Sequence, residues 1–139
     1  IYSGSIGSSP LYLTAVGNTL YFSADDGTNG TELWKSDGTA SGTVMVKDIH
    51  SGTSDSNPDY LTAVGNTLYF QAHDETHGNE LWKSDGTASG TMMVKDISPG
   101  SDSSYPSFLT PVGNTIYFVF LTETDFGMEM KGELWSFSL

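Results

Sequence analysis

A 48-residue internal repeat constrains this chain more than any other feature. The string LTAVGNTLYF begins at residue 13 and recurs 48 positions later, and the variant LTPVGNTIYF begins at residue 109. The string ELWKSDGTASGT begins at residue 32 and also recurs 48 positions later. Aligned without gaps, residues 13–60 and 61–108 are identical at 34 of 48 positions. Such a period predicts a tandem array of similar units that bury their apolar faces against one another.

The third unit departs from the other two. It carries five extra residues around 122–131, between Phe118 and Glu133, and it closes on ELWSFSL without a DGT turn. Terminal units of repeat arrays are commonly atypical because they face solvent or a different neighbour. We therefore expect one repeat domain, 1–139, with units at about 13–49, 61–97 and 109–139.

Each complete unit reads as four short strands. Apolar, aromatic and β-branched runs predict strands in the first unit at 13–16, 19–24, 32–36 and 43–49. Gly17-Asn18 predicts a tight hairpin and Asp37-Gly38 a turn, while no segment has the 3.6-residue apolar period of a helix. Four strands with one long return loop, repeated about every 40–50 residues, are typical of a β-propeller blade. We predict an all-β fold of propeller blades; a β-sandwich is the alternative, but it does not explain the strict period.

Three blades are fewer than the roughly four to eight that close a propeller ring. The chain opens at Ile1, in register with the end of a fourth strand at Ile49, and closes where a fourth strand should begin. We expect that it is a sector of a longer polypeptide or that chains self-associate to complete the ring. The register favours the longer polypeptide.

Composition excludes several function classes. Five lysines against 17 acidic residues give a net charge of −12, and there is no cysteine. Nucleic-acid binding and polybasic membrane attachment both need clustered basic residues, so we expect neither partner. The longest apolar run, residues 116–121, is far shorter than the ~20 residues of a membrane-spanning helix. Lys35 and Lys47 read as ordinary, partly exposed charges.

The segments ELWKSDGTASGT, followed by MVKDI in both complete units, resemble the ELWxxDGT repeat family. These repeats are similar to those found in tandem in large secreted or surface-attached bacterial proteins. The resemblance covers nearly the whole chain and implies a secreted or cell-surface location. It supplies no catalytic motif and no substrate.

One loop offers oxygen ligands at close spacing. Asp25, Asp26 and Glu32 could hold calcium, which prefers carboxylate oxygens. In the second unit, however, His73 replaces Asp25 and Glu75 replaces Gly27, which a calcium cage in every unit would not readily accept. A turn in which Asp and Asn side chains bind their own backbone is the favoured interpretation, and no other cofactor is expected.

Aromatic residues supply the candidate ligand surface. One tryptophan recurs in each unit, and its mid-strand position favours a buried spacer between sheets over a sugar platform. Aromatic residues on the return loops are better placed to meet a ligand. These candidate ligand residues are Tyr60, Tyr105 and Phe108.

Catalytic signatures are weak. The segment His73-Asp74-Glu75-Thr76-His77 joins two strands, whereas the zinc motif HExxH requires a helix, and His50 reads as a solvated loop residue. A repeat enzyme usually has one site that differs from its other repeats, and only the third-unit insertion, with Glu123, Asp125 and Glu129, qualifies.

We expect a non-enzymatic extracellular module that serves as scaffold, adhesion or interaction surface for a protein or glycan partner. A carbohydrate-binding propeller lectin is the alternative, and a glycoside hydrolase fragment ranks third.

Overall fold

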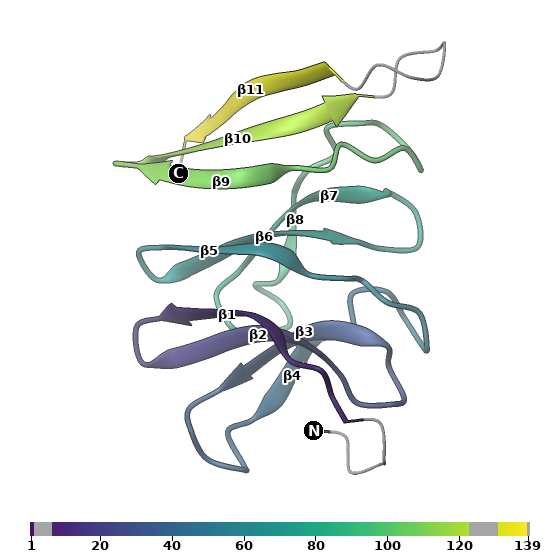
Figure 1. Ribbon diagram of the computed structural model, residues 1–139, viewed down its shortest axis with the longest axis vertical. Coiled ribbons are helices and arrows are strands. Elements are labelled where there is room, and N and C mark those ends of the chain that lie inside the picture. Colours follow the sequence, from purple (N-terminus) through teal and green to yellow (C-terminus); the bar gives the residue numbers. More distant parts are fainter. Residues whose placement is uncertain (2–6, 123–130, 139) are drawn as a thin grey trace.

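The computed structural model describes residues 1, 7–122 and 131–138. Within these residues the chain forms eleven strands, no helix and three antiparallel sheets stacked along the long axis (Figure 1). The predicted all-β fold is confirmed.

The strand order in each sheet follows the sequence. The first sheet contains β1 (Leu11–Val16), β2 (Thr19–Asp25), β3 (Thr31–Ser36) and β4 (Val44–Lys47). The second contains β5 (Asp59–Val64), β6 (Thr67–His73), β7 (Asn79–Ser84) and β8 (Met92–Lys95). The third contains β9 (Ser107–Val112), β10 (Thr115–Thr122) and β11 (Lys131–Ser138).

The fourth strand is shorter than predicted. It ends at Lys47 because Asp48 and Ile49 leave the sheet, and the backbone N–H of Ile49 donates to the carboxylate of Glu32 instead of to a neighbouring strand. β1 starts at Leu11, two residues before the predicted position, because a bulge between Leu11 and Thr14 lengthens its pairing with β2.

The sheets pack face to face, and their first strands lie side by side. β5 lies between β1 and β9. The Thr14 hydroxyl donates to the Leu61 carbonyl at 3.1 Å, and the corresponding Thr62 donates to the Leu109 carbonyl at 3.4 Å. The 48-residue repeat is therefore a structural repeat in which each unit joins the next through the same contact.

The middle sheet buries both of its faces. On β6, Leu68, Phe70 and Ala72 belong to the core shared with the first sheet. Tyr69, which points to the opposite side of the strand, belongs to the core shared with the third sheet. This explains why the strands carry aromatic residues on both faces.

Two lysines join the first and second sheets. Lys35 Nζ donates to the Gly86 carbonyl at 2.7 Å, and Lys47 Nζ donates to the Thr91 carbonyl at 3.0 Å. The Lys47 ammonium also lies 5.7 Å from the ring centroid of Trp82. Lys35 and Lys47 are partly exposed, as expected, but the interpretation of them as ordinary charges is wrong, because each bridges neighbouring units.

The antiparallel order sorts the connections onto two ends of the sheets. The turn end carries the Gly-Asn hairpins and the Asp-Gly-Thr turns. The loop end carries the β2–β3 loop (26–30), the β6–β7 loop (74–78) and the return loops (48–58 and 96–106), which lead into β5 and β9 (Figure 1). The β2–β3 and β6–β7 loops lie on the right of Figure 1 and the hairpins on the left.

Candidate functional site

Differences between the two complete units are confined almost entirely to the loop end. Of 14 differing positions, 13 fall within residues 23–31 and 50–60 and their counterparts 48 positions later. The remaining difference is Val44 against Met92. Exposure alone does not explain this, because the exposed turn residues 37–41 are identical to their counterparts 85–89. The loop end is therefore where the units differ in what they can contact.

The two variable segments form one continuous surface. Thr31 N donates to the Asp55 carboxylate at 2.6 Å, which joins the start of β3 to the return loop. His73 N donates to the Ser56 carbonyl at 3.0 Å, so the same return loop also contacts the end of β6. The backbone of Ser51 donates to Glu75 at 3.0 Å. The first return loop thus lies between the variable loops of the first and second units.

Buried glutamates fix the return loops in place. The Glu32 side chain is fully buried and accepts hydrogen bonds from the backbone N–H groups of Ile49, His50 and Ser56. It also accepts from the Ser56 hydroxyl at 2.6 Å. Burial raises the pKa of Glu32 to about 7, although these hydrogen bonds act to lower it. Glu32 therefore positions the loop and does not face a ligand.

The second unit repeats this arrangement. Glu80 is fully buried and accepts from the backbone of Ile97 and Ser98 and from the hydroxyl of Ser104, at 2.7 Å. Burial raises the pKa of Glu80 as well. The glutamate of the ELW signature is thus a structural residue whose role the sequence did not indicate.

The three candidate calcium ligands have separate partners. Asp25 accepts from Gly27 N at 2.6 Å, and Asp26 accepts from the backbone of Thr28 and Asn29 at 2.8 Å. Partial burial acts to raise the pKa of Asp26, but the bonds from Asn29 and Thr28 hold it below its usual value. Among residues 1, 7–122 and 131–138, no group of three or more His, Cys, Asp or Glu side chains is placed to hold a metal ion. These bonds are those of the turn interpretation, and calcium binding stays a prediction.

The two histidines of the HDETH segment face different partners. His77 Nδ1 lies 2.9 Å from the Asp74 carboxylate. His73 Nε2 instead lies 2.9 Å from Nδ1 of His50, with the two rings edge to face. The interpretation of His50 as a solvated residue is therefore wrong, because it joins the first return loop to β6.

Two of the repeated tryptophans, Trp82 and Trp135, lie between sheets, whereas Trp34 packs against Phe22 and Ala24 on the outer face of the first sheet. Trp34 and Trp82 are buried, and Trp135 packs edge to face against Phe120 with ring centroids 5.0 Å apart. The Lys95 ammonium lies 4.9 Å from the Trp135 ring centroid. The positions of Trp82 and Trp135 fit the expected spacer, and all three leave little ring surface for a ligand.

The structure brings two of the three candidate ligand aromatics together. Tyr60 and Phe108 are 39% and 71% exposed, and their ring centroids lie 6.1 Å apart. Tyr105 is 38% exposed on the second return loop and makes no ring contact with another described aromatic residue.

A strained backbone position presents these aromatics. Tyr60 and Phe108 have φ of 53° and 55° in the bulges of β5 and β9, and Tyr12 has φ of 56° in the bulge of β1. Bulky residues rarely adopt positive φ, which costs on the order of 1–3 kcal/mol and is concentrated at functional sites. Sequence reasoning missed Tyr12, although its position 48 residues before Tyr60 identifies it as the equivalent residue.

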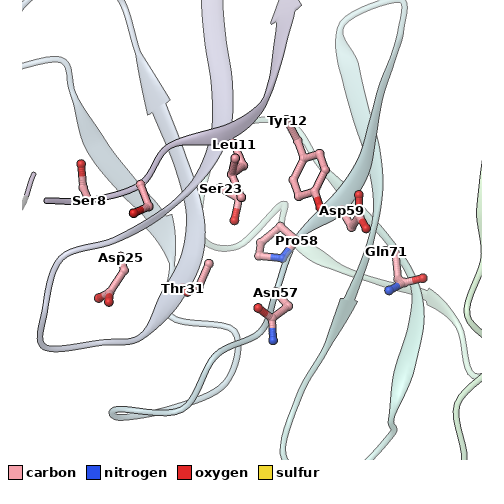
Figure 2. A pocket seen from close by; sticks show the side chains of 11 residues that line it. Ser8, Leu11, Tyr12, Ser23, Asp25, Thr31, Asn57, Pro58, Asp59 and Gln71 are labelled. Carbon is pink, nitrogen blue, oxygen red and sulfur yellow. The ribbon is translucent and has the colours of Figure 1, made fainter. Parts of the chain in front are cut away.

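A cavity of about 240 Å³ opens beside Tyr12, at the loop end between the first and second sheets (Figure 2). Every lining residue except Ser8 and Pro58 occupies a position at which the three units differ. The Asp59 carboxylate is the main cause that raises the pKa of Tyr12, and partial burial adds to it. The lining residues are Ser8, Ser9, Leu11, Tyr12, Ser23, Asp25, Thr31, Asn57, Pro58, Asp59 and Gln71.

The acids of the third-unit insertion, Glu123, Asp125 and Glu129, lie outside the described residues. The described part of the chain contains no helix of the length and apolarity needed to cross a membrane.

Comparisons with family models, curated proteins and solved structures give no significant match to this chain.

Proposed function

We propose that this chain is a β-propeller-type repeat module that acts by binding a partner at its loop end, as an extracellular adhesion or interaction surface. The carrying observation is the confinement of divergence between near-identical units to that end. Exposure alone does not explain this pattern, because the Asp-Gly-Thr turns, which are exposed apart from the buried Gly86, are unchanged. The resemblance to ELWxxDGT repeats of secreted and surface-attached bacterial proteins supports the extracellular location.

The sheet arrangement supports the propeller assignment. Each complete unit is a meander of four antiparallel strands, as in a propeller blade, and the first strands of consecutive sheets are neighbours. The return loops join the last strand of one sheet to the first strand of the next. Closing the ring requires further blades, supplied by a longer polypeptide or by a second copy of the chain.

Binding fits the site better than catalysis does. Glu32 and Glu80 have raised pKa values, as a general acid would, but both are enclosed by backbone donors and neither is exposed. They cannot reach a substrate without dismantling the return loops that they hold. A glycoside hydrolase would need two exposed carboxyl groups at a defined separation across a substrate. The two carboxylates that line the cavity beside Tyr12, Asp25 and Asp59, each already accept a backbone hydrogen bond at 2.6 Å.

A lectin is the second candidate function. The observation that favours it is the polar cavity beside Tyr12, which pairs an aromatic ring with carboxylate, amide and hydroxyl groups.

The test exchanges variable residues between units. The loop-end exchange variant carries Gln71→Ser, His73→Asp, Glu75→Gly, His77→Asn and Asn79→Thr, which places first-unit residues in the second unit. The control Met92→Val makes the same kind of exchange at the one differing position outside the loop end. Each labelled protein is applied to a printed array of glycans, bacterial polysaccharides and extracellular proteins.

We expect the wild type and Met92→Val to bind the same array elements and the loop-end exchange variant to lose or change that binding. Thermal melting checks that all three proteins are folded. Binding that the exchange leaves unchanged, or the absence of binding to every element, contradicts the proposed function.

A further inference from the structure

We infer that the cavity beside Tyr12 is a binding site for a single neutral sugar residue of a glycan. This inference rests on the proposed binding function and names the ligand class of one site at the loop end. Five properties of the cavity support it: the charge, the polar groups, the aromatic wall, the size, and the occurrence at one boundary between units.

The charge of the cavity disfavours anionic ligands. Two carboxylates, Asp25 and Asp59, line it, and no lysine does. The chain as a whole carries a net charge of −12. Phosphorylated, sulfated or uronic-acid ligands would therefore be repelled. Both carboxylates already accept a backbone hydrogen bond at 2.6 Å, from Gly27 and Tyr60 respectively. These bonds partly offset the negative charge and so weaken the attraction of the cavity for a cationic ligand.

The polar groups of the cavity match a ligand rich in hydroxyl groups. A sugar hydroxyl can both donate and accept a hydrogen bond. The lining supplies partners for both roles, namely carboxylate acceptors, carboxamides and further hydroxyls. The Asn57 carboxamide makes no hydrogen bond with any described side chain or backbone group, so both its donors and its acceptor are available. Asn57 also has φ of 46°, a left-handed conformation that asparagine tolerates.

The apolar wall fits the C–H face of a sugar ring. Tyr12 is 48% exposed, and Leu11 beside it is also exposed. Figure 2 shows the Tyr12 ring beside Asp59 and Pro58, so that an aromatic face and a carboxylate border the same space. An aromatic ring with a hydrogen-bonding group at its edge can contact the apolar and hydroxyl surfaces of a sugar together.

The size and occurrence of the cavity set the stoichiometry. Its volume of about 240 Å³ lies below the roughly 300–1,000 Å³ typical of drug-sized ligand pockets, which suits one sugar ring. At the next boundary, Tyr105, Ser107 and Val119 replace Asn57, Asp59 and Gln71. The polar set is therefore not repeated there, and we expect one such site per chain.

The test is calorimetric titration with methyl glycosides of glucose, galactose, mannose, fucose and N-acetylglucosamine, alongside glucuronate and glucosamine. We expect saturable one-to-one binding of at least one neutral glycoside. Tyr12→Ala should weaken it at least about tenfold through loss of the aromatic contact. Asp59→Asn should weaken it at least about fivefold. The control Asp85→Asn removes the same charge outside the cavity and should leave the affinity within about twofold.

Three results would overturn the assignment: no saturable binding of any neutral glycoside, unchanged affinity in Tyr12→Ala, or tighter binding of glucuronate or glucosamine. Thermal melting of each variant separates lost binding from lost folding. If array binding responds to the loop-end exchange while no glycoside binds, the sugar assignment fails and the proposed binding function stands.

Discussion

The buried carboxylate of Glu32 accepts a hydrogen bond from the Ser56 hydroxyl at 2.6 Å, across 24 residues of sequence. Glu80 and Ser104 repeat the bond at 2.7 Å. Each glutamate lies near the start of the third strand of its sheet and binds the return loop that leads to the next unit. The same contact therefore determines both the geometry of the repeat and the shape of the loop end.

Glu32→Gln should destabilise the protein by about 2 kcal/mol or more. The new amide group would face donors that now reach a carboxylate oxygen and would leave buried N–H groups unpaired. Urea unfolding measures the change. Glu80→Gln, at the equivalent position, should give a loss of similar size; a change below about 0.5 kcal/mol in both variants would contradict the structural role.

The contribution of Glu32 to stability should fall as pH rises. Its folded-state pKa of about 7 lies above the ordinary value of 4.5, so its protonated form is favoured by folding. The contribution is therefore complete below pH 4.5 and is lost as pH rises through about 7. The unfolding free energy of the wild type minus that of Glu32→Gln should decrease over this window, because titrations common to both proteins cancel. A difference that grows with pH would show that the pKa is lowered.

Lys35→Met should cost about 1 kcal/mol because Lys35 Nζ donates to the Gly86 carbonyl of the next unit. Lys83, its counterpart 48 positions later, donates no hydrogen bond to any residue that the structure describes. Lys83→Met is therefore the matched control and should change stability by less than about 0.5 kcal/mol. Equal losses in the two variants would argue against the bridge between units.

Gly30→Ala should destabilise the protein more than Gly52→Ala. Both glycines have positive φ, of 70° and 88°, but a β-carbon at Gly30 would overlap the Ser54 carbonyl, whereas one at Gly52 meets no atom within 4 Å. The difference between the two variants in chemical denaturation isolates the close approach of the return loop to the β2–β3 loop. We expect Gly52→Ala to cost about 1 kcal/mol and Gly30→Ala at least roughly twice as much.

Tyr12→Asn should maintain or raise stability while removing sugar binding. Asparagine tolerates the left-handed conformation that strains a tyrosine at φ of 56°, and Tyr12 is too exposed to contribute much core packing. Thermal melting and glycoside titration of the same protein check both parts. A melting temperature lowered by more than a few degrees would mean that Tyr12 is a structural residue.

The sequence was sufficient to predict the all-β architecture and its repeated sheets because the information is local and repeated. Gly17-Asn18 and its counterparts determine the hairpins, and alternating residues such as Leu68 and Tyr69 indicate two buried faces. The site was predicted less well because its contacts are non-local. The partners of Glu32 lie 17 to 24 residues away, and His50 finds His73 only when the return loop folds. The positive φ of Tyr12 cannot be predicted from the amino-acid composition, although alignment of the repeats would have identified Tyr12 as the equivalent of the candidate ligand residue Tyr60.

Hydrogen–deuterium exchange, with and without the array element that binds most strongly, tests the central claim most directly. The account predicts added protection at the loop end, in residues 8–12, 25–31 and 55–60, and unchanged exchange in the Asp-Gly-Thr turns at 37–42 and 85–90. Protection confined to those turns, with the loop end unchanged, would contradict it.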